Sequence, residues 1–293
     1  MGHALSKESF SENAPMVNDQ PTKNLRRPPL CCGQGVQALA WAERLDGYQA
    51  AVTESPLNKM AREGQLYQPA GLYPTSVDPT GFEYKEATIT GQEVIPLEEP
   101  SSPWPNGQVI FMNPSADGGL PHTRPPYYIC IPAGMVLTTP AGRQTLTHER
   151  IHVSQRLHED EWTAAYKTAW NWSVVTKPTL PTQYAQRVRI NPDTHNTPTY
   201  AWQGEWVPVP IFESAFAPSL KKTRIVWWHI PSKNIYSASP PGFDTYYGVG
   251  GTTTAAEGPH ELAAYILSSS TNQSPARRAL EPLMKEISKE EIY

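Results

Sequence analysis

The sequence predicts an α+β fold, in which a short-stranded sheet packs on one long helix and a second helix lies far along the chain. Residues 145–172 contain good helix formers and no internal Pro or Gly. Residues 67–144 combine many Pro and Gly with short apolar runs, which is typical of short strands with long loops. Residues 259–268 begin with a proline and continue with apolar residues, as expected of a short helix.

The predicted organisation is a polar flexible leader over residues 1–30, followed by a single domain over residues 31–293. In this domain, Ser55 and Pro56 suit the start of a helix, and the best strand is expected at 223–230. The expected elements are helices within 35–66, a strand-rich region over 67–144 with runs at 83–89, 108–112 and 127–131, a long helix over 145–172, loops and strands over 177–256, a helix over 259–268 and a C-terminal amphipathic helix over 275–290.

Composition excludes several classes of protein. The net charge is -4 without a concentrated basic segment, so nucleic acid is not an expected partner. Cys31, Cys32 and Cys130 form no disulfide framework, which indicates a reducing compartment. The chain lacks a signal-peptide pattern and any run of about 18 apolar residues, so we expect an intracellular protein without membrane-spanning helices.

The first residues, M-G-H-A-L-S-K, match the N-myristoylation pattern, with Gly2 as the acylated residue and Ser6 at the required position. One such chain gives only marginal membrane affinity, so stable peripheral attachment would need nearby basic residues or a second acyl chain. The same residues also fit an unmodified leader, and the sequence leaves both interpretations open.

The chemistry of the chain is concentrated in H-E-R-I-H-V-S-Q-R-L-H, residues 148–158. His148 and His152 are four positions apart, so a helix places both imidazoles on one face, where they can bind the same ion. Glu149 is rotated by about 100° from His148 and reaches the edge of that site. The predicted packing face carries Leu146, Val153, Leu157 and Ala164, and the opposite face His148, His152, Gln155, Glu159, Trp162 and Tyr166.

This H-E-x-x-H pattern resembles the zincin superfamily of metallopeptidases. The resemblance implies a zinc cofactor held by His148 and His152, with Glu149 as the general base of peptide-bond hydrolysis. It also implies a peptide or protein substrate that pairs with an edge strand, which precedes the helix over 145–172. Residues 127–131 are the expected edge strand, with His122 and Thr123 just before it and within reach of the cleft.

A catalytic zinc ion needs a third protein ligand, and two residues compete for this role. His158 has the spacing of the metzincin branch, but Gln155 replaces the glycine that ends the helix there, so we expect the helix to continue and turn His158 away. Glu261, near the start of the helix over 259–268, resembles the ligand glutamate of the gluzincin branch, although Tyr265 stands where an aspartate is common. We therefore favour Glu261, with His158 as the alternative.

Four further residues are candidates to stabilise the transition state of hydrolysis, because each offers a hydrogen-bond donor in the region expected near the cleft. They are His229, Tyr246, Tyr247 and Tyr265. Three readings of the whole chain remain: a zinc peptidase or a related amidase, an inactive zincin fold that serves as a structural or binding protein and is associated with a membrane through Gly2, and a protein without metal.

Overall fold

The computed structural model describes residues 34–63, 95–96, 104–105, 107–112, 114, 116–132 and 134–290. These residues belong to one compact unit, Cys32–Tyr293. The expected leader, the acylation pattern at Gly2 and the strand expected at 83–89 lie outside the described residues. Among the described helices, none combines the length and the apolar content needed to cross a membrane.

The first sheet has four strands in the order β1-β2-β4-β3. Its two inner strands, β2 (Gln108–Met112) and β4 (Tyr128–Pro132), are parallel. The outer strands, β1 (Ile95–Pro96) and β3 (His122–Arg124), run antiparallel to their neighbours. The prediction that residues 127–131 form a free edge is wrong, because β4 is hydrogen-bonded on both sides and β3 forms the edge instead.

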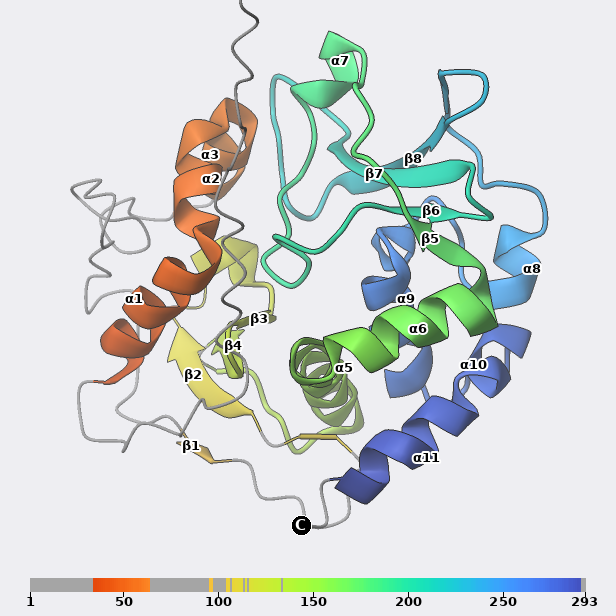
Figure 1. The fold of residues 1–293 in the computed structure, drawn as a ribbon. Helices are drawn as coiled ribbons and strands as arrows, with labels where there is room; N and C mark the ends of the chain where they lie inside the picture. The colour runs from red at the N-terminus through yellow and green to blue at the C-terminus, as the bar shows by residue number, and fades with distance from the viewer. Residues whose placement is uncertain are drawn as a thin grey trace, which may run out of the picture. The chain divides into compact units, whose positions relative to one another are not determined.

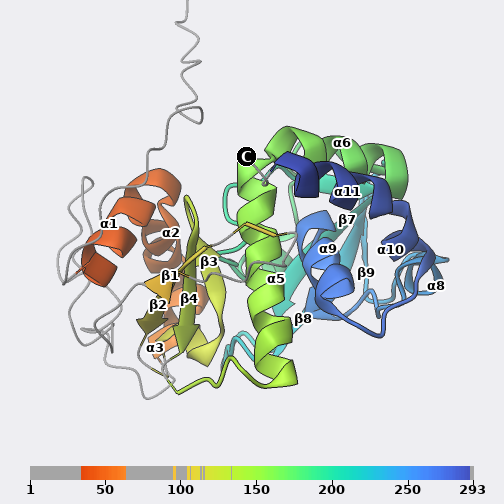
Figure 2. The same cartoon turned by 90° about the horizontal axis from the view of Figure 1, so that it is seen from below.

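Both faces of this sheet are covered by helices. Ile110 and Cys130 on one face pack against α1 (Gln34–Asp46) and α2 (Tyr48–Glu54), whereas Val109 and Ile129 on the other face pack against α5 (Pro140–Leu157). Figure 2 shows the sheet between these two groups of helices. The alternation of side chains along a strand explains why neighbouring residues contact different layers. The sheet thus lies between α1 and α2 on one side and α5 on the other. The third N-terminal helix, α3 (Pro56–Glu63), packs through Ala61 against Phe212 and Leu220 instead.

The metal-motif helix begins earlier and ends earlier than the sequence predicts. The helix was expected to start at residue 145, but the N-cap of α5 is Thr139, whose side chain accepts a hydrogen bond from the backbone N–H of Gly142. A Cβ at Gly142 would collide with the carbonyl oxygen of Val136, so only glycine fits there. The helix does not continue to residue 172, because His158 has non-helical dihedrals (φ -126°, ψ 46°) and separates α5 from α6 (Glu159–Trp170).

The second sheet is antiparallel, with five strands in the order β5-β6-β7-β8-β9. One face and the helices beside it form a core rich in aromatic residues, and Figure 1 shows α6, α9, α10 and α11 on that side. The elements of this half are β5 (Trp172–Val174), α7 (Thr182–Ala185), β6 (Tyr200–Trp202), β7 (Trp206–Phe212), β8 (Thr223–His229), β9 (Asn234–Tyr236), α8 (Phe243–Tyr247), α9 (Pro259–Ser268), α10 (Pro275–Ala279) and α11 (Glu281–Glu290).

The core corrects three further expectations. Trp162 and Tyr166, predicted on the side of α6 that presents chemistry, are fully buried in the aromatic core. Leu157, predicted to pack, is 49% exposed at the end of α5. The expected single C-terminal helix is divided at Leu280 into α10 and α11.

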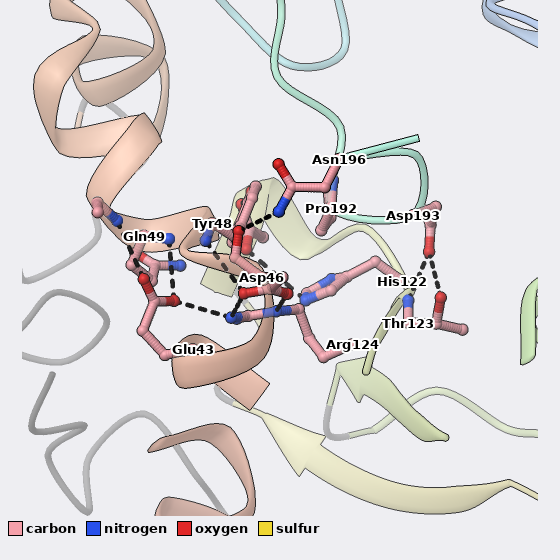
Figure 3. Close-up of polar contacts among 12 residues, drawn as sticks. Glu43, Asp46, Tyr48, Gln49, His122, Thr123, Arg124, Pro192, Asp193 and Asn196 are labelled. Carbon is pink, nitrogen blue, oxygen red and sulfur yellow. Dashed lines mark hydrogen bonds and ion pairs between the residues drawn. The ribbon is translucent and has the colours of Figure 1, made fainter. Parts of the chain in front are cut away.

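A buried charged network joins the N-terminal helices to the sheet edge (Figure 3). The guanidinium group of Arg124 on β3 lies 2.8 Å from Glu43 Oε2 and 2.7 Å from Asp46 Oδ2, both on α1. The same edge reaches the segment 188–196, because the backbone N–H and the hydroxyl of Thr123 both donate to Asp193 Oδ1. Asn196 donates to the backbone oxygen of Asp46. The segment 188–196 is therefore held from two sides, which matters because it reaches the candidate site.

Candidate metal centre

Two helices bring together His148, His152 and Glu261, whose ligand atoms all lie within 4.8 Å of one another. His148 Nε2 lies 3.1 Å from His152 Nε2 and 3.5 Å from Glu261 Oε2, and His152 Nε2 lies 3.7 Å from Glu261 Oε1. Ligand atoms about 2.05 Å from a tetrahedral zinc ion would be about 3.3 Å apart. The spacing therefore fits three ligands of one ion. The expectation that Glu261 joins the two histidines is confirmed as geometry, and His158 is not in the group.

Local sequence explains how this group forms. His148 and His152 lie one turn apart on α5, and the helical period gives them a common face. Pro259 occupies the first turn of α9, where its missing N–H costs nothing, and Glu261 follows in the same turn. Leu262 and Ile266 anchor α9 in the aromatic core. The packing of α9 against α5 therefore brings Glu261 to the histidines.

Gln155 orients His152, a role that the sequence analysis missed. Its Oε1 lies 2.7 Å from His152 Nδ1, and its Nε2 donates to the backbone oxygen of His260 at 2.9 Å. Because the side-chain amide is fixed in this way, His152 donates from Nδ1 and keeps the lone pair of Nε2 for a metal ion. The residue that replaces the metzincin glycine thus has a function of its own. The signal in the sequence was its position three residues after His152.

Asn191 holds the third member of the group. Its Nδ2 donates to Glu261 Oε1 at 2.6 Å, and both residues are buried. Burial alone would raise the pKa of Glu261, but the neighbouring His152 and His148 lower this pKa well below its usual value. Burial alone would lower the pKa of His152, but the carboxylates of Asp193 and Glu261 outweigh it and raise this pKa. The group thus contains a carboxylate that stays ionised beside two imidazoles.

Glu149 is buried beside this group and lines the same cavity. Its Oε2 has no hydrogen-bond partner in the protein, which is unusual for a buried carboxyl oxygen. Burial, together with the charges of Asp193 and Glu261, raises the pKa of Glu149 well above its usual value. A carboxyl group with a raised pKa and an unpaired oxygen is suited to accept and return a proton.

The cavity has a volume of about 1000 Å³. Residues of both α5 and α9 line it, including His148, Glu149 and Glu261. His122 also lines it, with Nε2 lying 3.7 Å from Asp117 Oδ2. Thr123 is not a lining residue, and its hydroxyl group donates a hydrogen bond to Asp193 Oδ1. The cavity therefore extends from the metal group to the edge strand β3, and its size is in the range of pockets that hold sizeable ligands.

The predicted transition-state stabilisers divide into two groups. Tyr265 lines the cavity, and its ring centroid lies 4.7 Å from that of His148. Burial raises the pKa of its hydroxyl to about 12, so the group remains protonated at neutral pH. His229, Tyr246 and Tyr247 are not among the lining residues.

The structure gives the three residues outside the cavity other partners. His229 packs on Trp206 and lies 2.8 Å from Ser232 Oγ. The hydroxyl groups of Tyr246 and Tyr247, on α8, donate to backbone oxygens at the end of α6. The expectation that these two tyrosines lie near the cleft is wrong, because aromatic packing places α8 against the core.

If the group holds a metal ion such as zinc, replacing Gln155 with leucine is expected to weaken the affinity for that ion by about 10–100-fold, because His152 loses the acceptor that fixes its orientation. Competition titration with a chromophoric chelator measures the change. Gln155→Glu retains an acceptor for His152 and should recover most of the affinity. An exposed control, Gln186→Leu, should behave like the unmodified chain. Equal affinity of all four proteins would contradict the role given to Gln155.

Comparisons of the chain with protein-family models, with curated proteins and with solved structures returned no match. The likeness to zincins is therefore carried by the H-E-x-x-H pattern and the geometry of the site. What the structure establishes is an α+β fold with a buried group of two histidines and one glutamate that could hold a metal ion.

Proposed function

We propose that this chain is a zinc-dependent metallopeptidase of the gluzincin-like type. The observation that carries the proposal is the spacing of His148, His152 and Glu261 beside the buried carboxyl group of Glu149, a residue that lines the same large cavity. Two imidazoles and one carboxylate are a ligand set of known catalytic zinc sites, which leave a further position open. The opening of the group to the cavity supports a catalytic centre, because structural zinc sites have four protein ligands.

Zinc, when bound, would polarise the substrate carbonyl and make water acidic enough to react near neutral pH. The protein residues supply the rest of the chemistry. Glu149 Oε2 accepts the proton of the attacking water and then returns it to the nitrogen of the leaving amine. Gln155 and Asn191 keep His152 and Glu261 in place. The hydroxyl group of Tyr265 is the proposed donor to the oxygen that becomes negatively charged.

Zinc content and its removal test the proposal. We expect the purified chain to contain one zinc ion per molecule and to cut an unstructured protein such as casein. Treatment with 1,10-phenanthroline should abolish cleavage, and added zinc should restore it. Absence of stoichiometric zinc would reject the proposal.

A different outcome would favour a structural role for the metal, since the group also links α5 to α9. In that case zinc would be present and its removal would lower the melting temperature, but no peptide would be cut. This alternative corresponds to an inactive zincin fold that serves as a structural or binding protein.

A further inference from the structure

The outer edge of β3 is closed by the segment 188–196. Thr123, the middle residue of this three-residue strand, is fully buried, and its backbone N–H donates to Asp193 Oδ1 at 2.6 Å. Its backbone oxygen accepts from Arg156 Nη2 at 3.4 Å. In an antiparallel pair the backbone groups of alternate residues point away from the neighbouring strand, so these are the groups that an added strand would use. A peptide substrate could pair with β3 only by displacing Asp193 and Arg156.

The carboxyl group of Asp193 is fixed through one of its two oxygens (Figure 3). Oδ1 accepts from both the backbone N–H and the hydroxyl group of Thr123. The main chain of Asp193 is held as well, because its oxygen accepts from Arg156 Nη2 at 3.1 Å and its N–H donates to Asn191 Oδ1 at 3.2 Å. The carboxyl group is therefore positioned before any ligand arrives, which lowers the entropic cost of binding.

The other carboxyl oxygen of Asp193, Oδ2, is available to a ligand. Within the part of the chain that the structure describes, Oδ2 has no hydrogen-bond partner and the carboxyl group has no ion pair. Arg156 binds the backbone oxygens of Pro192 and Asp193 and leaves the carboxyl group free. Asp193 is partly exposed and lines the cavity, and its Oδ2 is not one of the unpaired atoms that are sealed from solvent.

This carboxyl group lies near the reacting end of the cavity. Burial raises the pKa of Glu149 most, and among the neighbouring charges Asp193 raises it more than Glu261 does. For His152, burial lowers the pKa, and Asp193 is again the strongest of the charges that raise it. Because the effect of a charge falls with distance, Asp193 must lie close to both residues. A group bound to Oδ2 is therefore held next to the general base and the metal group.

The chemistry of Oδ2 defines the class of ligand. A carboxylate oxygen without a counter-ion favours a cationic hydrogen-bond donor, and it disfavours an anion. In a peptide the free α-amino group is separated from the carbonyl carbon of its own residue by the Cα atom alone, whereas a lysine ammonium group stands at the end of a four-carbon stem. The closed edge of β3 offers nothing to an interior segment of a chain. A chain end, in contrast, can be held by its ammonium group.

We propose that Asp193 Oδ2 binds the protonated α-amino group of the first residue of a peptide, so that this chain removes residues one at a time from the N-terminal end. The subsite rests on the proposed peptidase function, because it places the first peptide bond of the substrate at the proposed metal centre. Water adds across that bond, which releases one free amino acid and a shorter peptide with a new α-amino group. Asp193 itself forms no covalent bond.

The test compares two peptides that differ only at the N-terminus. The probes are amidated Leu-Phe-Ala-Val-Gly with a free α-amino group and the same peptide after acetylation. The experiment is run at pH 7, where an α-amino group with its ordinary pKa of about 8 is protonated. Calorimetry on zinc-loaded Glu149→Gln protein measures both dissociation constants without cleavage. Mass spectrometry of the unmodified chain with the free peptide identifies the first product.

We expect the free peptide to bind about 10–100-fold more tightly than the acetylated one, as for hydrogen bonds to charged groups. Asp193→Asn, made in the same Glu149→Gln protein, keeps an oxygen for Thr123 but loses the charge, so this ratio should fall to about one. Glu213→Gln, which removes an exposed charge from the same cavity, should keep the ratio. A purely structural role of Asp193 would instead weaken both peptides equally. The unmodified chain should release leucine first.

Four results would overturn the subsite: no binding of either peptide, equal binding of both, a ratio that persists in Asp193→Asn, or a first cut at an interior bond. These results differ from failure of the proposed function. If the unmodified chain cuts both peptides with zinc at interior bonds, the subsite alone is wrong. If binding favours the free peptide through Asp193 but the zinc-loaded chain cuts nothing, the peptidase function alone is wrong.

Discussion

Glu149→Gln is expected to lower kcat for peptide hydrolysis by about 10²–10⁴-fold while the protein keeps one zinc ion per molecule. Glutamine has nearly the same shape as glutamate but cannot take a proton from water. Burial already favours the uncharged form of this carboxyl group by raising its pKa, so an uncharged amide of nearly the same shape should leave the fold intact. Rates measured on a fluorogenic peptide, with zinc content measured by mass spectrometry, check both parts of the expectation.

The matched control is Glu161→Gln, an exposed glutamate in the first turn of α6. This variant loses the same charge at a position outside the cavity lining, and it should retain full activity. If Glu149→Gln were as active as the control, Glu149 would not be the general base. If Glu149→Gln also lost zinc, its effect would come from the metal group instead of from proton transfer.

Glu261→Ala is expected to weaken zinc affinity by more than the 10–100-fold that loss of a supporting residue such as Gln155 causes, because it removes a direct ligand. Hydrolysis should disappear at the zinc concentrations that saturate the unmodified chain. The dissociation constant of zinc, measured by chelator competition, and the rate at increasing zinc check this expectation.

His158→Ala is the comparison that separates the two candidate third ligands. His158 lies at the junction of α5 and α6 and is not in the metal group, so zinc affinity should not change. The opposite pattern, with zinc lost in His158→Ala and kept in Glu261→Ala, would show that the metzincin-type arrangement holds. If neither variant lost zinc, neither Glu261 nor His158 would be the third protein ligand.

The helix break at His158 was not predicted from the sequence, although the expected position of His158 away from the metal group was right. We expected the helix to continue through Gln155 and turn His158 away, but the helix ends at Leu157. His158 is nevertheless outside the metal group. The non-helical dihedrals at His158 accompany the burial of Trp162 and Tyr166 in the aromatic core, a long-range contact that local helix propensity does not contain.

The sequence by itself determined the elements whose signals are local. The helical period pairs His148 with His152, and Pro259 starts the helix that carries Glu261. The limits of that second helix agree with the prediction. Short apolar runs also located β2, β4 and β8 within one residue at each end.

Only the tertiary structure decided which distant residues support and surround the metal group. Gln155, Asn191 and Asp193 act through hydrogen bonds across 3 to 105 positions of the chain. It also placed Tyr265 on the cavity and His229 outside it. The physical reason is that periodicity and capping depend on neighbouring residues, whereas these contacts depend on how α5, α9 and the segment 188–196 pack together.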